Sequence, residues 1–166
     1  MQLPSVKPKF LYYAMQSIHS PIHTPPTTVL GCVNVDYCNM LAYADTAIGD
    51  LLATLHASPR WNNTVVVIHS DNGGAVPLGG SNAPFAGSKG TWLEGGVHVP
   101  AMIGGGILPP SRRGTSYTRL AHITDMYSTV LALASNGSYP VASEVDGINL
   151  WPSIGKAKAR VTWLWC

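Results

Sequence analysis

The chain has 166 residues, 46% of them hydrophobic, and a formal net charge of +2, so it can bury a substantial core and one domain is expected. The pair Arg112 and Arg113 is its largest basic cluster, which leaves no electrostatic footprint for nucleic acid. Its apolar runs fall short of the ~20 residues of a membrane span, and MQLPSVKPKF lacks the apolar region of a signal peptide.

The first half of the chain predicts a strand, a helix and a second strand. We expect a strand over 10–15, a Pro-rich loop over 19–34, and a helix over 37–56 that Pro59 stops. The β-branched run at 64–68 predicts a strand buried on both faces, as in a parallel or mixed sheet covered by helices. The expected apolar stripe of the helix consists of Met40, Leu41, Ala44, Ala47, Ile48, Leu51, Leu52 and Leu55.

The second half predicts one more strand and one more helix. A strand is expected over 97–103, with Pro100 placing it at an edge or bulge. A helix is expected over 123–134, with Thr124 or Asp125 in capping position. This order indicates an α/β fold, with a right-handed crossover if the first two strands are parallel.

A polar tetrapeptide follows the predicted strand at 64–68. Asp71 and Asn72 offer hard oxygen donors that suit Ca²⁺ or Mg²⁺, and Gly73 and Gly74 allow a sharp turn beneath an ion. Ligand chemistry in such folds lies beyond the carboxyl ends of strands. The same four residues also make a good turn, so the motif alone leaves both interpretations open.

The loop that continues to residue 97 favours the functional interpretation. It has no apolar period, and a loop of this length in a compact domain is usually functional or disordered. Its aromatic residues argue against disorder. The polar and aromatic residues of this loop include Ser81, Asn82, Lys89, Trp92 and Glu94.

The order of motifs resembles the type I sulfatases, especially the arylsulfatase B branch. SDNGG followed by GSNAPFAGSKGTWLEGGVHVP is similar to the metal and sulfate loop of that family. KPKFLYYAMQSIHSPIHTPP upstream, and LAHITDMYSTVLALAS and VDGINLWPSI downstream, extend the likeness over about residues 7–154. The resemblance implies an alkaline phosphatase-like mixed sheet flanked by helices, here incomplete.

The resemblance also implies roles for particular residues. Asp71 and Asn72 would bind the metal, which is Ca²⁺ with Mg²⁺ as the alternative. Lys89 would bind a sulfate oxygen and stabilise the leaving group, and His19 would bind sulfate or assist proton transfer. In the family a formylglycine diol attacks sulfur, the alcohol leaves, and the remaining hydroxyl expels sulfate. The implied partner is a small-molecule or glycan sulfate ester.

The formylglycine motif of the family, Cys-x-Pro-x-Arg or Cys-x-Ala-x-Arg, does not occur in this chain. Cys32, Cys38 and Cys166 all stand in other contexts, and we expect free or buried thiols rather than a disulfide. The family's N-terminal Asp-Asp ligands are also missing. The chain therefore resembles the C-terminal portion of a sulfatase catalytic domain over 1–154, with a divergent, non-native tail at 155–166, and we expect no turnover from it alone.

Other polar residues receive structural interpretations. His23, His69, His98 and His122 are expected to be structural or to support the site, and Trp92 and Glu94 to pack the loop. Asn62 and Asn136 begin sequons in predicted surface turns and would be glycosylated in a secretory parent, whether lysosomal or extracellular.

Two other functions stay open at the level of sequence. One is a related metal-dependent phosphatase or phosphodiesterase of the alkaline phosphatase superfamily, although such enzymes place His-rich ligands where Asp71 stands. The other is a non-catalytic fragment that retains the fold and a binding role. An in-frame Cys-x-Pro-x-Arg upstream would favour the sulfatase.

Overall fold

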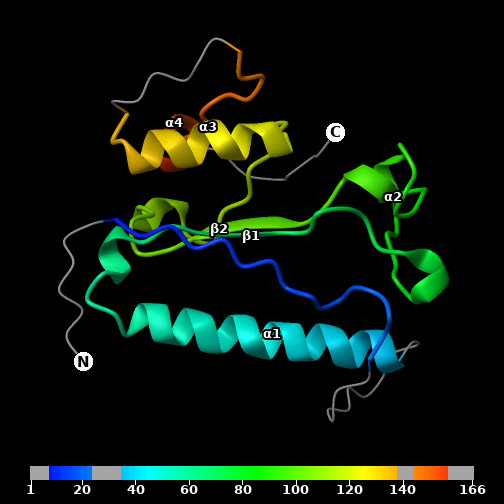
Figure 1. The fold of residues 1–166 in the computed structure, drawn as a ribbon. Helices are drawn as coiled ribbons and strands as arrows, with labels where there is room; N and C mark the ends of the chain where they lie inside the picture. Colours follow the sequence, from blue (N-terminus) through cyan, green and yellow to red (C-terminus); the bar gives the residue numbers. More distant parts are fainter. Residues whose placement is uncertain (1–7, 24–34, 138–143, 157–166) are drawn as a thin grey trace.

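The computed structural model describes residues 8–23, 35–137 and 144–156. Figure 1 shows a small sheet between one long helix on one side and two helices on the other. A one-turn helix lies at one end of the strands, and the long loop around it carries the candidate site. The elements are α1 (Val35–His56), β1 (Val66–His69), α2 (Glu94–Val97), β2 (Ala101–Gly104), α3 (Ile123–Ala134) and α4 (Trp151–Lys156).

Helix α1 confirms the helix predicted over 37–56 and begins two residues earlier. Met40 and Ala44 are buried at four-residue spacing, as the apolar stripe requires. Leu41 was expected in that stripe, but 51% of it is exposed. Leu41 is rotated by about 100° from Met40 and away from the buried Asn39, so it lies beyond the edge of the buried face.

Cys38 in the first turn of α1 is disulfide-bonded, so the expected free thiol is wrong at this position. Its partner lies outside the described residues. The error arises because pairing depends on how the chain folds back on itself, which cysteine spacing alone does not reveal.

The sheet contains β1 and β2, which pair antiparallel with Val66 opposite Gly104 and His69 opposite Ala101. Residues Val66 to Ile68 are half-buried, so the prediction of a strand buried on both faces is wrong. Among the described residues, β1 has a hydrogen-bonded neighbour on one edge only.

The strand predicted over 10–15 is not formed. This segment is irregular in the structure and its apolar side chains are exposed to solvent. Without a hydrogen-bonded neighbour, an apolar run of strand-like composition has no ladder to join, and the expected parallel crossover to β1 is absent from the described part of the chain. The exposed fractions are 75% for Phe10, 72% for Leu11, 79% for Tyr12 and 61% for Tyr13.

The strand predicted over 97–103 is shorter than expected. Val97 ends helix α2, and β2 starts only after Pro100. The Pro100 carbonyl accepts a hydrogen bond from Ser70 N at 3.2 Å, so the proline lies just outside the ladder and still ties β2 to the loop after β1.

Helix α3 has the predicted bounds, and Asp125 takes part in its capping as expected, although the N-cap residue itself is His122. Its Nδ1 accepts from Thr124 N at 3.4 Å, and Asp125 Oδ2 accepts from His122 N at 2.7 Å. Asp125 therefore completes a capping box at the third helical position. Sequence reasoning missed the cap because histidine is an uncommon residue there.

The core lies between β2, α3 and α4. Half-buried side chains pack against it, including Ile103 of β2 and Met126 of α3. Helix α3 adds a row of buried polar residues: Asp125 Oδ1 accepts from Ile148 N at 2.9 Å, and Ser128 Oγ donates to Gly147 O at 2.7 Å. The buried core residues are Val99, Leu108, Tyr117, Ala121, Leu150 and Ile154.

Candidate functional site

The loop that follows β1 passes in direct backbone contact with α2. Gly73 N donates to Gly96 O at 2.8 Å. A Cβ built on Gly73 would lie 1.9 Å from Gly95 O, far inside van der Waals contact. Glycine is therefore required at this crossing, because two main chains touch with no room for a side chain. The crossing fixes where Asp71 and Asn72 lie relative to α2.

Asn82 connects the beginning and the end of this loop. Its Oδ1 accepts from Gly74 N at 2.7 Å, and its Nδ2 donates to Gly74 O at 2.9 Å and to Gly87 O at 3.1 Å. Gly74 O also accepts from Lys89 N at 3.2 Å and from Ser88 Oγ at 3.3 Å. The amide of Asn82 thus holds the Asp-Asn-Gly-Gly turn beside the segment that carries Lys89. Sequence reasoning gave Asn82 no role, although a side-chain amide in a Gly-rich loop is a signal for such bridging.

The structure brings together the two residues expected to bind sulfate. Lys89 Nζ lies 3.0 Å from His19 Nε2, although 70 positions separate them in the chain. His19 Nδ1 lies 2.8 Å from Ser20 O, and a carbonyl can only accept, so Nδ1 carries the proton. Nε2 then accepts from the lysine ammonium. The pair therefore combines a cation with a neutral imidazole whose tautomer is set by its own neighbour.

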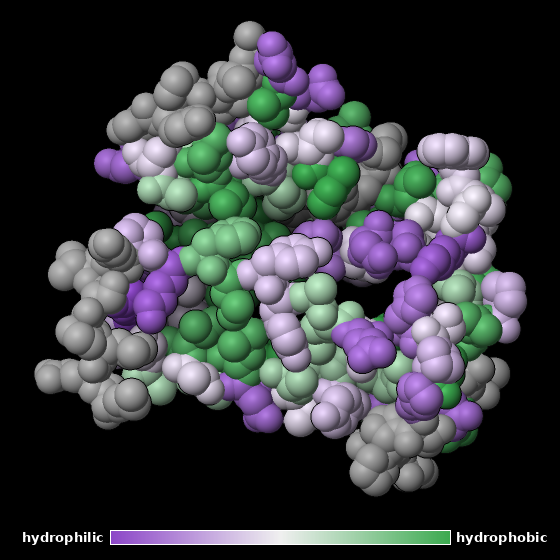
Figure 2. Space-filling model, in the orientation of Figure 1, coloured by the Kyte–Doolittle hydropathy of each residue, from purple (hydrophilic) through white to green (hydrophobic). Residues whose placement is uncertain are grey.

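Asp71 and Asn72 line a cavity of about 400 Å³, whose wall includes Gly90, the residue after Lys89, but neither Lys89 nor His19. Asp71 Oδ1 accepts from Asn72 N at 3.0 Å, and Asn72 Nδ2 donates to Gly73 O at 2.9 Å. The side-chain nitrogen of Asn72 is thus hydrogen-bonded within the loop, and its side-chain oxygen is the atom suited to bind a cation. Figure 2 shows hydrophilic side chains gathered around an opening on the same half of the molecule as α2.

Asp71 and Asn72 offer the type of ligand atom that a hard cation prefers, but too few of them. A carboxylate and an amide oxygen are ligands that Ca²⁺ and Mg²⁺ accept. The described residues contain no cluster of three or more His, Cys, Asp or Glu side chains able to hold a metal. The pair supplies at most about three oxygen donors, whereas Ca²⁺ takes six to eight.

Several histidines have contacts that accord with structural roles. His98 Nδ1 lies 2.9 Å from Glu94 Oε2, and its ring centroid is 4.3 Å from that of Phe85. The pair joins the first residue of α2 to the residue after its end, and the loop-packing role of Glu94 stays a prediction. His122 caps α3, and His69 Nδ1 lies 2.9 Å from Ser70 O at the end of β1.

Trp92 does not pack the loop as predicted. It is 95% exposed and lines the cavity that Asp71 and Asn72 also line. The prediction was wrong because aromatic residues in loops usually bury their rings, and sequence alone does not give the direction of the ring.

Both predicted sequon asparagines lie on the surface. Asn62 is exposed in the turn Trp61–Asn63, and Asn136 is exposed just after α3 with a φ of 52°. The surface position is confirmed, and glycan attachment stays a prediction.

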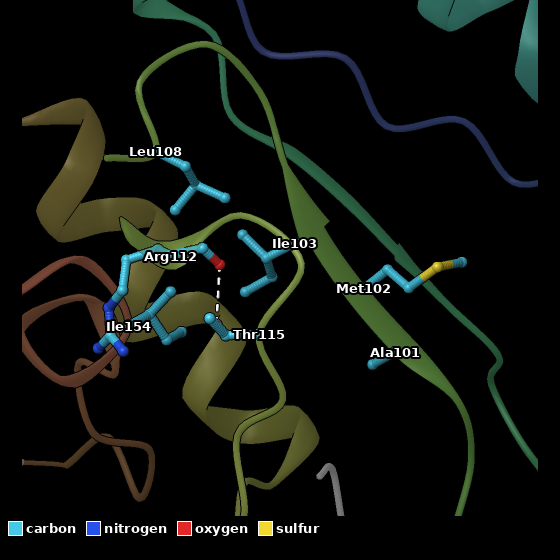
Figure 3. A pocket seen from close by; sticks show the side chains of 7 residues that line it. All are labelled: Ala101, Met102, Ile103, Leu108, Arg112, Thr115 and Ile154. Carbon is cyan, nitrogen blue, oxygen red and sulfur yellow. Dashed lines mark hydrogen bonds between the residues drawn. The ribbon is translucent and has the colours of Figure 1, made fainter. Parts of the chain in front are cut away.

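A second, smaller cavity of about 150 Å³ lies between β2 and α4 (Figure 3). Its lining is mostly aliphatic, and Arg112 at its wall donates from Nη2 to Ser153 O at 2.7 Å. The guanidinium ties the turn Pro110–Arg112 to α4, so this cavity belongs to the core rather than to the candidate site.

A family model described as Sulfatase matches residues 2–136. The chain belongs to the sulfatase family. This sulfatase chain is 35% identical over 156 residues to arylsulfatase J of Mus musculus, a match that covers 90% of the chain and 26% of the relative. It is 33% identical over 153 residues to N-acetylgalactosamine-6-sulfatase of Homo sapiens, covering 89% of the chain and 28% of that protein. The match corresponds to a C-terminal region of the sulfatase catalytic domain.

Solved structures confirm the expected fold of this sulfatase chain. It superimposes on Ps i-CgsB with a TM-score of 0.70 at 27% identity, covering 83% of the chain and 31% of that structure. The same protein in complex with k-i-k-neocarrahexaose gives a TM-score of 0.69. The chain thus has the alkaline phosphatase-like fold in incomplete form. Within the described ranges, no helix combines the length and apolar character needed to cross a membrane.

Proposed function

We propose that this chain forms part of an active site that hydrolyses sulfate esters, with Lys89 and His19 as its sulfate-binding and catalytic residues. The observation that carries the proposal is the 3.0 Å contact between Lys89 Nζ and His19 Nε2. Asp71 and Asn72 line a cavity whose wall also includes Gly90, the residue next to Lys89 in the chain. Family membership supports sulfate ester hydrolysis as the general chemistry.

The chemistry of the pair suits an anionic ester. An ammonium group has three protons, so Lys89 can donate to His19 and still bind a sulfate oxygen. A fixed positive charge at this point would stabilise the negative charge that develops on the leaving oxygen. His19 Nε2 accepts from Lys89 and carries no proton of its own, so it would assist proton transfer to the departing alcohol by relaying a proton that it takes up at Nε2.

Asp71 and Asn72 would hold a Ca²⁺ ion, with Mg²⁺ as the alternative. When bound, the ion would neutralise charge on the sulfate. Since these residues supply only about half of the usual protein ligands, we infer that the remaining ligands belong to parts of a sulfatase domain beyond this sequence. The nucleophile would come from the same source, because no cysteine here stands in a formylglycine motif.

Calcium binding by the chain alone should be weak. A site with one carboxylate and one amide oxygen predicts a dissociation constant of about a millimolar or higher. Calorimetry checks this value. In a protein that restores the N-terminal half of the domain, binding should tighten, and Asp71→Ala should remove most of the gain. An unchanged affinity in that variant would make Asp71 a turn residue only.

Sulfate binding and turnover test the proposal directly. We expect the isolated chain to release no product from an aryl sulfate, with or without a formylglycine-generating enzyme. NMR titration with inorganic sulfate should nevertheless perturb the His19 ring. Lys89→Met should weaken this binding about tenfold, in the range of one charge-assisted hydrogen bond.

Lys9→Met is the matched control, because Lys9 is also exposed but is distant in sequence from the loop, and sulfate binding should be unchanged. Equal loss in both variants would show nonspecific charge attraction and contradict the site. Turnover by the wild-type chain above the level of Lys89→Ala would contradict the expected inactivity.

A further inference from the structure

Lys89 occupies the second position of a tight turn. Thr91 N donates to Ser88 O at 3.0 Å, and Gly90 at the third position has a φ of 85°, as a type II turn requires. The lysine side chain is a flexible stem of four carbons, so the place of its ammonium depends on how firmly the main chain beneath it is held. The residues that hold this turn therefore bear on the contact between Lys89 and His19.

The side chain of Thr91 closes the same turn a second time. Its hydroxyl donates to Ser88 O at 2.8 Å and accepts from Ser88 N at 3.1 Å. Thr91 also lines the cavity that contains Asp71 and Asn72 in its wall. A hydroxyl has a single proton to donate, and here Ser88 O accepts it, so the hydroxyl cannot also donate to an anion in the cavity. Its partners are the main-chain atoms around Lys89.

Two glycines leave room for the Thr91 hydroxyl. A Cβ built on Gly87 would lie 2.7 Å from Thr91 Oγ1, and a Cβ built on Gly96 would lie 2.9 Å from it. Both distances are shorter than van der Waals contact, so a side chain at either position would displace the hydroxyl. Gly96 is also the residue of α2 whose carbonyl accepts from Gly73 N. The Thr91 hydroxyl therefore lies where the Lys89 turn meets α2.

The opposite side of the turn is tied to the loop after β1. Lys89 N donates to Gly74 O at 3.2 Å. Ser88 Oγ accepts from Val76 N at 3.2 Å and donates to Gly74 O at 3.3 Å. Ser88 thus binds this loop through its side chain and Thr91 through its main chain. The main chain of Lys89 is held between these two sets of hydrogen bonds.

We propose that Thr91 is a positioning residue, whose hydroxyl holds the Ser88–Thr91 turn so that the Lys89 ammonium lies at His19 Nε2. The assignment rests on the proposed function and extends it to a residue that acts through the lysine without touching the sulfate. Loss of the hydroxyl should leave Lys89 chemically intact but let its ammonium occupy more positions. The fraction of molecules ready to bind an anion then falls, and the apparent affinity falls with it.

The test follows the binding of inorganic sulfate and the ring nitrogens of His19 in the full chain by NMR. Thr91→Val removes the hydroxyl, so sulfate should bind about three- to tenfold more weakly, as for the loss of about one net hydrogen bond. The Nε2 signal should move toward its position in Lys89→Met. Thr91→Ser keeps a hydroxyl and should restore both readouts. In the Lys89→Met background, Thr91→Val should cause no further loss, because its effect passes through the lysine.

Thr54→Val is the matched control, because the Thr54 hydroxyl also donates to a main-chain carbonyl, that of Asp50 at 2.9 Å, but lies in α1. It should leave both readouts unchanged. Wild-type affinity in Thr91→Val, no difference between Thr91→Val and Thr91→Ser, or an equal further loss in the Lys89→Met background would overturn the positioning role. Weak binding by Lys89→Met would still uphold the proposed function in each of these cases. Sulfate binding that Lys89→Met leaves unchanged would overturn the proposed function itself.

Discussion

Gly73→Ala should destabilise the chain by about 3–4 kcal/mol, at the upper end of overpacking effects. The added Cβ would lie 1.9 Å from Gly95 O and 3.0 Å from the Cα of Gly96. Neither neighbour is a flexible side chain that can move aside. The crossing is also held by the hydrogen bond from Gly73 N to Gly96 O, so relief of the clash requires the loop and α2 to separate. Urea denaturation followed by circular dichroism measures the loss.

Gly49→Ala is a control for which we expect the opposite change in the free energy of unfolding. Gly49 lies within α1, and a Cβ there would meet nothing within 4 Å. Alanine is favoured over glycine in a helix interior by about 0.5–1 kcal/mol, so this variant should be more stable than the wild type. If both variants shift the urea midpoint in the same direction, the backbone contact at Gly73 does not determine stability.

The two longer helices could be predicted because local pattern determines them. In α1, apolar residues recur at three- and four-residue steps and Pro59 follows soon after the end. In α3, the predicted and observed bounds coincide. Helical hydrogen bonds close within a few residues, so the information needed for these elements is contained in short stretches of sequence.

The strands depend on distant partners, and there the predictions failed. The segment at 10–15 has strand-like residues but no hydrogen-bonded neighbour in the described part of the chain. The direction of the β1–β2 pairing, and the exposure of both strand faces, depend on what packs against the sheet. His122 acts as a cap because Thr124 and Asp125 surround it, and residue preference alone ranks histidine low there.

The candidate site was predicted in composition but not in arrangement. The tetrapeptide at Asp71 and the resemblance to sulfatases indicated the residues, whereas the meeting of Lys89 with His19 required the fold. The bridging role of Asn82 was not predicted, because it depends on which two carbonyls the side-chain amide contacts in the folded chain. Those carbonyls belong to Gly74 and Gly87.

Asn82→Asp should destabilise the chain by about 3 kcal/mol at neutral pH. The replacement has the same shape, and its Oδ1 can still accept from Gly74 N. However, the second carboxylate oxygen would face Gly74 O and Gly87 O, which the native amide approaches at 2.9 and 3.1 Å. Both carbonyls would lose the amide donor and meet a negative charge, at a cost of about 1–3 kcal/mol each when partly buried, although Gly74 O would keep its hydrogen bonds from Lys89 N and Ser88 Oγ. At the same time, the Asp71 turn would no longer be held beside the segment that carries Lys89.

Acidic pH should partly rescue Asn82→Asp, and this distinguishes the hydrogen bonds from mere side-chain volume. A protonated carboxyl can donate to one of the two carbonyls, so folding should raise the pKa of the introduced group above its value in the unfolded chain. The stabilising contribution of the proton is then complete below the unfolded pKa and is lost as pH rises through the folded pKa. The gap in unfolding free energy between wild type and Asn82→Asp should therefore widen from pH 4 to pH 7, while the gap for Asn82→Ala stays constant. A parallel pH dependence of the two variants would show that Asn82 fills space without holding Gly74 and Gly87 together.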